Sequence, residues 1–526
     1  MIITINKYLA YSCLFLVFFT QNIFAQDTNI KDFGALADGR TINTVSIQKA
    51  IDQTAVKGGT VVIPQGEFLS GTIYLKSNVS LYIQKGGMLK GSPLLKDYPE
   101  NTPSVKGMKP HRAFWKSMPS RALIYADSVQ NIGILGEGSI DGNGRSPAFV
   151  TEDDNPNRPK LIFVVNCKKV RVEGLRFQNT AFWLQHYFAC DGVIIKGLNI
   201  YNHGNKNVDG IDIDSKNVVV SDCIIDCDDD ALCFKSDGNF LCENVVVTNC
   251  ILSTTCNFIK MGTASYTGFK NISITNCVLK RPSESLVRDW SKQSRGIKDS
   301  LTGLAGIALE IVDGGKMDKI NISNIVMSGV QTPIFIRLGS RMNPTGSISN
   351  VSISNIMATA ESFITSSITA VPGFYVDNVV LNNIQFFNNG FNSPFPQSPT
   401  IKEHEKDYPE NRMFGDNLPA YGFYLRHVKN ISLQQIQFNI SGEEHRPALH
   451  IEDAENISVN HCKIKIPANN QPVVRIIDTK GLLLSNLYDT QNPIPFLLET
   501  NGININKIRI VNQEGEKGDN LVKNKL

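Results

Sequence analysis

VVVSDCII at residues 218–225, VVVTNCIL at residues 245–252 and ISITNCVL at residues 272–279 decide the fold. Each of these octets begins 27 residues after the one before it and carries a cysteine at its sixth position. Apolar and polar residues alternate, and β-branched residues dominate, as in a strand that buries one face. We therefore interpret the three cysteines as stacked, buried thiols of a structural repeat, rather than as a disulfide framework or a metal site.

The octet recurs along most of the chain, usually after Asn or Lys-Asn, and most steps are no longer than 31 residues. Further octets begin at Val170, Val193, Ile320, Val351, Val379, Ile431, Ile457 and Leu482. The two-residue turns of hairpins are absent, so one strand position is revisited on every coil. This pattern predicts an all-β protein, a single-stranded parallel β-helix that runs from about residue 27 to about residue 515.

Two wide gaps between octets interrupt the repeat. We interpret them as loop insertions at about 281–305 and 387–425, which should project from one face of the solenoid. Near the start, a helical apolar face predicts a helix that caps the open first coil; its residues are Ile47, Ala50, Ile51 and Ala55. The β-helix domain then occupies residues 26–526.

The first residues have the features of a secretory signal. Residues 1–25 hold one basic residue, Lys7, then an apolar run that ends at the small residue Ala25. We predict a signal peptide over 1–25, with an uncleaved anchor as the alternative, and hence a secreted or periplasmic protein. No later segment is apolar enough to span a membrane, and a net charge of +3 gives no support for a nucleic-acid partner.

Residues 207–237, NVDGIDIDSKNVVVSDCIIDCDDDALCFKSD, crowd nine aspartates into thirty-one positions. Aligning the coils brings DGIDIDS, DALCFKS and NFIKMGT into register, so Asp209, Asp230 and Asn257 should stack about 4.8 Å apart. Asp229 should lie beside them and Asp212 close by. Carboxylates within roughly 5–10 Å of one another suit the hydrolysis of a glycosidic bond. A calcium site or a solvated acidic ridge is the alternative.

The sequence resembles the family 28 glycoside hydrolases, the polygalacturonase group. The resemblance rests on DFGALADG at 32–39, GSIDGNG at 138–144, NVDGID at 207–212 and DDALCFKSD at 229–237. It implies a right-handed parallel β-helix and hydrolysis of α-linked uronides with inversion. It also implies that Asp229 is the general acid, while Asp209 and Asp230 hold the attacking water.

The chain departs from the family pattern in two places. No histidine lies near Asn257, where the family has Gly-His-Gly, and Ala308 and Glu310 replace the basic residues of Arg-Ile-Lys. Either the neighbouring sugar is neutral or relocated cations bind its carboxylate; the candidates are Lys260, Arg337 and Arg341. The predicted substrate-binding residues are Asn257, Lys260, Glu310, Arg337 and Asp212. We interpret His186 and His203 as structural histidines.

The sequence predicts an exported, inverting glycoside hydrolase that acts on a pectin-like or related acidic or branched polysaccharide. Two alternatives stay open: a carbohydrate-binding β-helix that has lost catalysis, and a polysaccharide lyase. No cofactor and no metal ion are expected. Because Glu310 stands where a cation would bind a uronate, unsubstituted polygalacturonate is expected to be a poor substrate.

Overall fold

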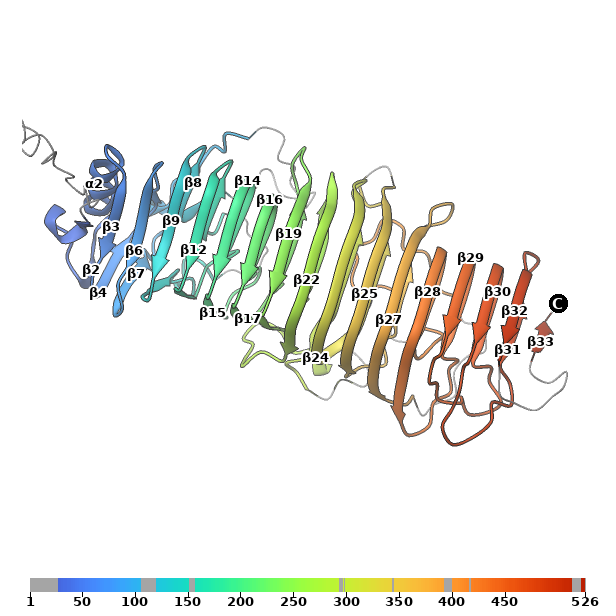
Figure 1. The fold of residues 1–526 in the computed structure, drawn as a ribbon. Coiled ribbons are helices and arrows are strands. Elements are labelled where there is room, and N and C mark those ends of the chain that lie inside the picture. The colour runs from blue at the N-terminus through green and yellow to red at the C-terminus, as the bar shows by residue number, and fades with distance from the viewer. Residues whose placement is uncertain are drawn as a thin grey trace, which may run out of the picture.

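The structure, a computed structural model, describes residues 27–105, 120–150, 157–292, 297, 299–342, 345–391, 400–415, 418–512 and 522–525. The signal peptide predicted over 1–25 lies outside this part of the chain. Every strand pairing in the described residues is parallel, and the strands join into one continuous ladder of coils. The predicted right-handed parallel β-helix is therefore confirmed, and Figure 1 shows its coils stacked side by side along one axis.

The strands form three faces that repeat on successive coils. The first face comprises β1 (Thr28–Asn29), β3 (Gly59–Ile63), β6 (Val79–Ile83), β9 (Gln130–Gly136), β12 (Lys168–Glu173), β19 (Cys242–Thr248) and β32 (Asn506–Val511). The second comprises β2 (Asp38–Ile42), β4 (Gly66–Ser70), β7 (Gly87–Gly91), β10 (Ser139–Asp141), β13 (Arg176–Gln178), β15 (Asn199–Asn202), β17 (Ile224–Cys227) and β20 (Ile251–Thr254). The third comprises β5 (Ile73–Tyr74), β8 (Ala122–Asp127), β11 (Lys160–Val165), β18 (Leu232–Ser236), β21 (Ile259–Ser265), β23 (Gly303–Ile311), β26 (Ser366–Thr369), β31 (Leu498–Asn501) and β33 (Val522–Lys525).

Longer strands bend around a corner and belong to more than one face. They are β14 (Gln185–Lys196), β16 (Ile211–Ser221), β22 (Gly268–Lys280), β24 (Lys316–Leu338), β25 (Ser347–Ala360), β27 (Val376–Asn389), β28 (Phe423–Ser441), β29 (Leu449–Asn460) and β30 (Val474–Ser485). Short 3₁₀ turns occur at η1 (Ile30–Phe33), η2 (Leu95–Asp97) and η3 (Trp290–Lys292). Because the chain revisits each face in the same order, any residue at a corner has a neighbour at that corner on the next coil.

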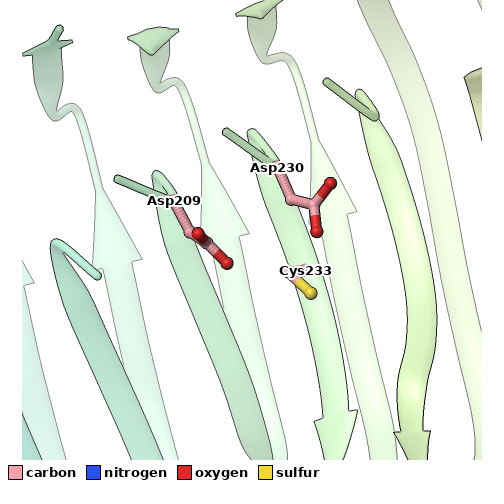
Figure 2. A group of neighbouring side chains, drawn as sticks. All are labelled: Asp209, Asp230 and Cys233. Carbon is pink, nitrogen blue, oxygen red and sulfur yellow. The ribbon is translucent and has the colours of Figure 1, made fainter. Parts of the chain in front are cut away.

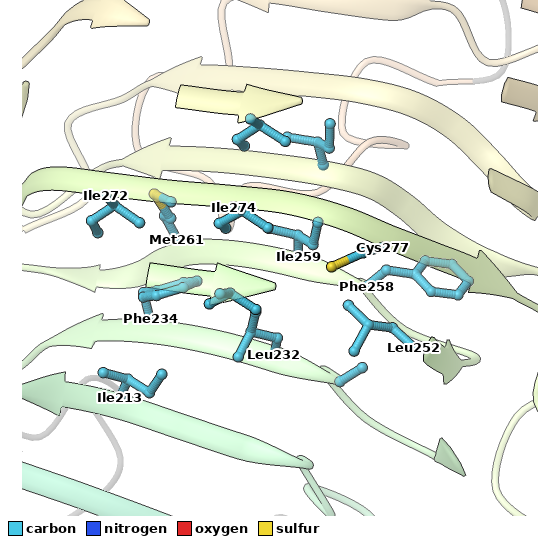
Figure 3. Close-up of a cluster of buried hydrophobic side chains, with 14 of the residues drawn as sticks. Ile213, Leu232, Phe234, Leu252, Phe258, Ile259, Met261, Ile272, Ile274 and Cys277 are labelled. Carbon is cyan, nitrogen blue, oxygen red and sulfur yellow. The ribbon is translucent and has the colours of Figure 1, made fainter. Parts of the chain in front are cut away.

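The octets form the buried lining of the solenoid. Val218 pairs with Val245, and Val245 pairs with Ile272, so the three octets stack in register. Cys223, Cys250 and Cys277 are buried in the core, as predicted, and Figure 3 shows Cys277 among its apolar neighbours. Each thiol hydrogen-bonds to a backbone carbonyl two residues earlier, and none of the ten described cysteines forms a disulfide. The thiols therefore behave as small hydrophobic residues.

Asparagines mark the corner before most of the octets. Asn217, Asn244 and Asn271 all have φ near +55°, a left-handed conformation that asparagine tolerates better than other non-glycine residues. The Asn244 amide donates to the Asn217 side-chain oxygen at 3.2 Å, and Asn271 donates to Asn244 at 3.0 Å. The side-chain ladder thus satisfies polar groups where the chain turns, which explains why asparagine precedes most octets.

A helix lies at the N-terminal end of the stack, where the sequence predicts one. Helix α2 (Thr44–Ala55) buries Ile47, Ala50 and Ile51 in the solenoid core, with Ala55 partly buried beside them. Figure 1 shows α2 beside the first coils. That the helix protects the first coil from edge-to-edge association stays a prediction. No described helix combines the length and apolarity that crossing a bilayer requires.

Both insertions connect a strand of the second face to a strand of the third face, so they leave the solenoid at the same corner. The first connects β22 to β23 over residues 281–302, and the second connects β27 to β28 over residues 390–422. Both are slightly shorter than predicted, because strand pairing continues through Asn389 and resumes at Gly303 and Phe423. This shared corner is also where the clustered aspartates lie.

Candidate active site

The aspartates lie on the corner that precedes the third-face strands. Asp209 comes just before β16, and Asp229 and Asp230 come just before β18. Gly210 N–H donates to the Asp230 carbonyl at 2.9 Å, and Ala231 N–H donates to the Asn257 carbonyl at 2.9 Å. The predicted stacking of Asp209, Asp230 and Asn257 is therefore confirmed.

The close stacking of these turns depends on a glycine. A Cβ at Gly210 would lie 2.4 Å from the Ala231 carbonyl oxygen on the next coil, closer than any side chain tolerates. Figure 2 shows the result: Asp209 and Asp230 extend from the starts of neighbouring coils, with Cys233 on the strand that follows Asp230. One carboxylate oxygen of each aspartate and the Cys233 sulfur all lie within 4.8 Å of one another.

Asp230 is held in its ionised form. Its Oδ2 lies 3.0 Å from Lys260 Nζ, and its Oδ1 accepts a hydrogen bond of 2.9 Å from the Asn257 amide. Burial alone would raise the pKa of Asp230, but Lys260, Lys235 and Asn257 outweigh burial and hold the pKa well below its ordinary value. Asp230 is therefore a carboxylate at every pH at which such a protein works.

Asp209 is in the opposite electrostatic state. Burial raises its pKa well above the ordinary value, the nearby Asp212 carboxylate adds to the effect, and Lys235 only partly opposes them. Lys235 Nζ lies 3.4 Å from Asp209 and 3.1 Å from Asp212. The pKa of Asp209 is thus shifted in the opposite direction from the pKa of the neighbouring Asp230.

Asp229 contacts a cation that comes from the first insertion. Arg288 Nη2 lies 2.6 Å from Asp229 Oδ2, and Arg288 Nη1 also donates to the Asp228 carbonyl. Asp229 Oδ1 accepts a hydrogen bond of 2.9 Å from the Asp230 N–H, which fixes the carboxylate next to the other two. Arg288 could not be identified from the sequence, because it lies in an insertion. An insertion does not repeat from coil to coil, so spacing along the chain does not give its position.

Two cavities meet at the carboxylates. The smaller, about 30 Å³, is lined by Asp209, Asp229, Asp230, Lys235 and Trp183 among others, and is large enough for a water molecule. The larger, about 280 Å³, is lined by Asp229 and Asn257 on the solenoid and by both insertions. Of the three carboxylates, Asp229 alone lines both cavities among the described residues.

The insertions supply the outer wall of the larger cavity. Trp290 donates its indole N–H to the Thr255 carbonyl at 2.6 Å, and the Arg412 guanidinium of the second insertion lies 4.3 Å from its ring centre. Tyr408, also from the second insertion, accepts a hydrogen bond of 3.3 Å from Lys260. The cavity is therefore built jointly by two segments that lie more than a hundred residues apart in sequence.

Some predicted residues lie outside the cavities. Arg337 is buried and donates to the carbonyls of Ala370, Glu403 and His404, so it holds the second insertion instead of facing a ligand. Arg341 likewise forms a two-point ion pair with Asp313. The proposed recognition of substrate by Arg337 is therefore not supported by its position.

Glu310 and Asp212 are also enclosed. Burial raises the pKa of Glu310 to about 8, although Lys260 opposes the rise, so Glu310 is mostly uncharged at neutral pH and lines neither cavity. The expectation that Glu310 repels a uronate therefore loses its basis. Asp212 is fully buried behind Asp209 and pairs with Lys235. Of the predicted binding residues, Asn257 and Lys260 are those that line a cavity.

His203 anchors the turn beneath the first insertion. Its Nε2 lies 3.0 Å from Asp226 and its Nδ1 lies 3.2 Å from Asp228, and Asp226 in turn accepts the Ser283 N–H. Burial alone would lower the pKa of His203, but the two carboxylates outweigh it and raise the pKa to about 9. His203 is therefore structural, and so is His186, which is buried and stacked on Phe163.

We expect this anchor to give stability a defined pH dependence. Because the pKa of His203 rises from 6.5 to about 9 on folding, its contribution is complete below pH 6.5 and is lost as the pH rises through about 9. His203→Gln should lower the free energy of unfolding by about 3 kcal/mol at pH 6 and remove that alkaline loss. Thermal unfolding between pH 6 and 10 checks this, and parallel curves for both proteins would contradict it.

The acidic cluster already has its positive charge from lysines. Lys235 Nζ lies 3.3 Å from the Cys233 sulfur, and Lys260 contacts Asp230, so ammonium groups occupy the surroundings of the carboxylates. A thiol and two carboxylates backed by lysines also differ from the all-oxygen ligand set that calcium prefers. The absence of a required metal ion stays a prediction.

Comparisons with known proteins find relatives among the polygalacturonases. A probable polygalacturonase of Vitis vinifera is 26% identical over 226 residues, which cover 40% of this chain and 45% of that protein. An exo-poly-α-D-galacturonosidase of Dickeya chrysanthemi is 32% identical over 158 residues, which cover 29% of this chain and 25% of that protein. The chain thus spans less than half the length of these curated relatives.

Solved structures share the fold. An exopolygalacturonase from Thermotoga maritima matches 69% of this chain and 87% of its own with a TM-score of 0.55 and 21% identity. A polygalacturonase from Erwinia carotovora matches 69% of this chain and 93% of its own, with a TM-score of 0.52 and 21% identity. Residues 54–386, more than half of the chain, match the model of the glycosyl hydrolases family 28, and the chain belongs to that family.

Proposed function

We propose that this protein is an exported hydrolase that cleaves glycosidic bonds in a pectin-like polysaccharide with inversion at the anomeric carbon. The observation that carries the proposal is the convergence of Asp209, Asp229 and Asp230 on a water-sized cavity, with the pKa of Asp230 lowered and the pKa of Asp209 raised. A hydrolase needs a base and a proton donor side by side, and a binding protein gains nothing from burying three carboxyl groups together.

Asp230 is the residue best suited to act as the base. Its charge is secured by Lys260 and Asn257, and it lines the small cavity in which a water molecule fits. Asp209, whose pKa is raised by burial, lines the same cavity and orients the same water through hydrogen bonds. This is the water-holding role that the resemblance implies for Asp209.

Asp229 is the proposed proton donor. It lines both cavities, so it lies where the water-sized cavity meets the larger one, which has room for a sugar ring. In the reaction the water oxygen attacks the anomeric carbon while the bond to the leaving oxygen breaks. The leaving oxygen takes the proton of Asp229, and Asp230 accepts the proton released by the water, so that charge and atoms balance.

The shape of the larger cavity favours action near a chain end. Trp290 and Tyr408 provide aromatic surface for a sugar ring, and the two insertions close around the same cavity. The similarity to an exo-poly-α-D-galacturonosidase points the same way. Product sizing distinguishes this from internal cleavage, because end-directed action releases short products from the first minutes.

The purified protein should therefore hydrolyse a member of a panel of pectic polymers and oligosaccharides. Proton NMR during the reaction should show that the first product has the inverted anomeric configuration. Retained configuration would contradict the mechanism, an unsaturated product would identify a lyase, and binding without cleavage across the panel would identify a carbohydrate-binding protein. N-terminal sequencing of the protein recovered from the medium or periplasm checks export and should show that residues 1–25 are gone.

A further inference from the structure

Three cations form ion pairs with the carboxylates, and they differ in how exposed their side chains are. Lys260 balances Asp230, and Lys235 balances Asp209 and Asp212; both lysine side chains are at most 7% exposed. Arg288 balances Asp229 and is 21% exposed, at the wall of the larger cavity. Of the three cations that are paired with these carboxylates, Arg288 is therefore the one that a ligand in this cavity can reach most readily.

In the proposed reaction Arg288 also behaves differently from the two lysines. Asp230 stays ionised until the water attacks, so Lys260 keeps its partner as substrate binds. Asp229, as the proton donor, must instead take up a proton from solvent before the bond breaks, and it then no longer balances Arg288. Asp228 is also close enough to interact with the guanidinium, but Arg288 has lost its direct ion pair, which favours the entry of another anion in place of Asp229.

We propose, on the basis of the function proposed above, that Arg288 recognises a carboxylate of the substrate and that it does so by exchanging Asp229 for that carboxylate. The substrate class is accordingly a polysaccharide with a uronate next to the cleaved bond. Arg288 then takes the role that was predicted from the sequence for Lys260 and Arg337, which is to bind the substrate carboxylate in place of the basic residues of the family. A substrate without a carboxylate leaves Asp229 in its ion pair for most of the time, so that it is cleaved more slowly than the acidic substrate.

The first insertion holds Arg288 in place for this exchange. Trp290 is fixed by its bond to Thr255, and Glu284 contacts both Arg145 and the Tyr201 hydroxyl. Because Arg288 Nη1 stays with the Asp228 carbonyl, the guanidinium plane keeps its orientation while Nη2 changes partner. A planar guanidinium is well matched to a carboxylate, which makes arginine the appropriate residue at such a site.

The exchange also accounts for the return to the starting state. After proton transfer Asp229 is again a carboxylate and competes with the product for Arg288, while Asp230 releases to solvent the proton that it took from the water. The other charged residues lining the two site cavities among the described residues are Lys206, Asp209, Asp230, Lys235, Lys260 and Glu410. Lys235 and Lys260 stay in contact with Asp209 and Asp230, and the Lys260–Asp230 ion pair is restored when Asp230 loses that proton.

A binding experiment tests the exchange without turnover. Asp229→Asn removes the competing carboxylate, so calorimetric titration should show galacturonate binding roughly tenfold more tightly to this variant than to the unaltered protein. Galactose, which has no carboxylate, should bind both proteins equally. Adding Arg288→Gln to Asp229→Asn should abolish the gain for galacturonate; unchanged galacturonate binding in Asp229→Asn would overturn the proposal.

An activity experiment uses a matched control in the same insertion. Arg281 pairs with Asp299 and Glu361 and lines a separate cavity of about 450 Å³, away from the carboxylates. Arg288→Gln should lower kcat/KM on oligogalacturonate by roughly 10- to 100-fold more than on the carboxyl-reduced oligomer, whereas Arg281→Gln should leave that ratio unchanged.

The outcomes separate this inference from the function on which it rests. If the unaltered protein cleaves none of the pectic substrates, the proposed function fails. If it cleaves them but Arg288→Gln affects the acidic and carboxyl-reduced oligomers equally, the function stands and Arg288 serves only to hold the insertion. A larger loss on the acidic oligomer, together with the binding result, supports the exchange.

Discussion

Replacing Asp229 with asparagine is expected to reduce turnover by roughly 10²-fold or more, because the amide cannot supply a proton to the leaving oxygen. The amide keeps the size of the side chain, so substrate should still bind. Asp230→Asn should cause a loss of similar size by removing the base, and Asp209→Asn should do so by misplacing the water. Initial rates on the preferred pectic substrate, fitted for kcat and KM, measure each effect.

The three carboxyl groups should act as one unit. The triple variant is expected to be scarcely less active than Asp229→Asn alone. Once the proton donor is missing, the leaving oxygen is not protonated, so losing the residues that activate the water costs little more. Asp222→Asn is the matched control, since Asp222 lies in the same repeat with its side chain exposed and contacts only Asn249 in the described residues. Substantial turnover by the triple variant would refute the assigned roles.

Replacing Lys260 with methionine should damage both stability and activity. Asp230 would then be buried without its counter-charge, which costs about 3–5 kcal/mol in the free energy of unfolding. Activity should fall because the charge of the base is no longer secured. Denaturant unfolding and steady-state kinetics on the same preparation measure the two effects.

The pH profile gives a sharper readout of the same change. The pKa of Asp230 lies below its ordinary value chiefly because Lys260 and Lys235 oppose burial, so removing Lys260 must raise it. The acidic limb of kcat/KM should therefore move to higher pH. The double variant Asp230→Asn with Lys260→Met should recover much of the stability, since no unpaired charge remains, but no activity. An unchanged acidic limb would contradict the role of Lys260.

The fold could be predicted because a solenoid repeats a local rule. Each octet alternates apolar and polar residues, and each asparagine before it accepts a left-handed turn, so sequence spacing alone places Val218, Val245 and Ile272 in one stack. The same register places Asp209 below Asp230 and Asp230 below Asn257. Pairing from coil to coil makes distance along the chain equivalent to distance along the solenoid axis.

The insertions and the charge states could not be predicted in this way. Arg288, Trp290 and Tyr408 lie in segments without a repeat, so nothing in the sequence places them over the aspartates. Arg337 lies where the strand register of the repeat places it, but the second insertion covers it. Its guanidinium therefore binds the backbone of that insertion instead of a ligand.

The sequence by itself therefore determined the β-helix, its core of stacked thiols and the corner where the carboxyl groups meet, because these follow from a period and an alternation. Only the tertiary structure decided which carboxyl is ionised, which cation reaches the cavity and which is sealed away. These properties depend on burial and on which charges come within 3–4 Å, and both are set by loops that converge from distant parts of the chain.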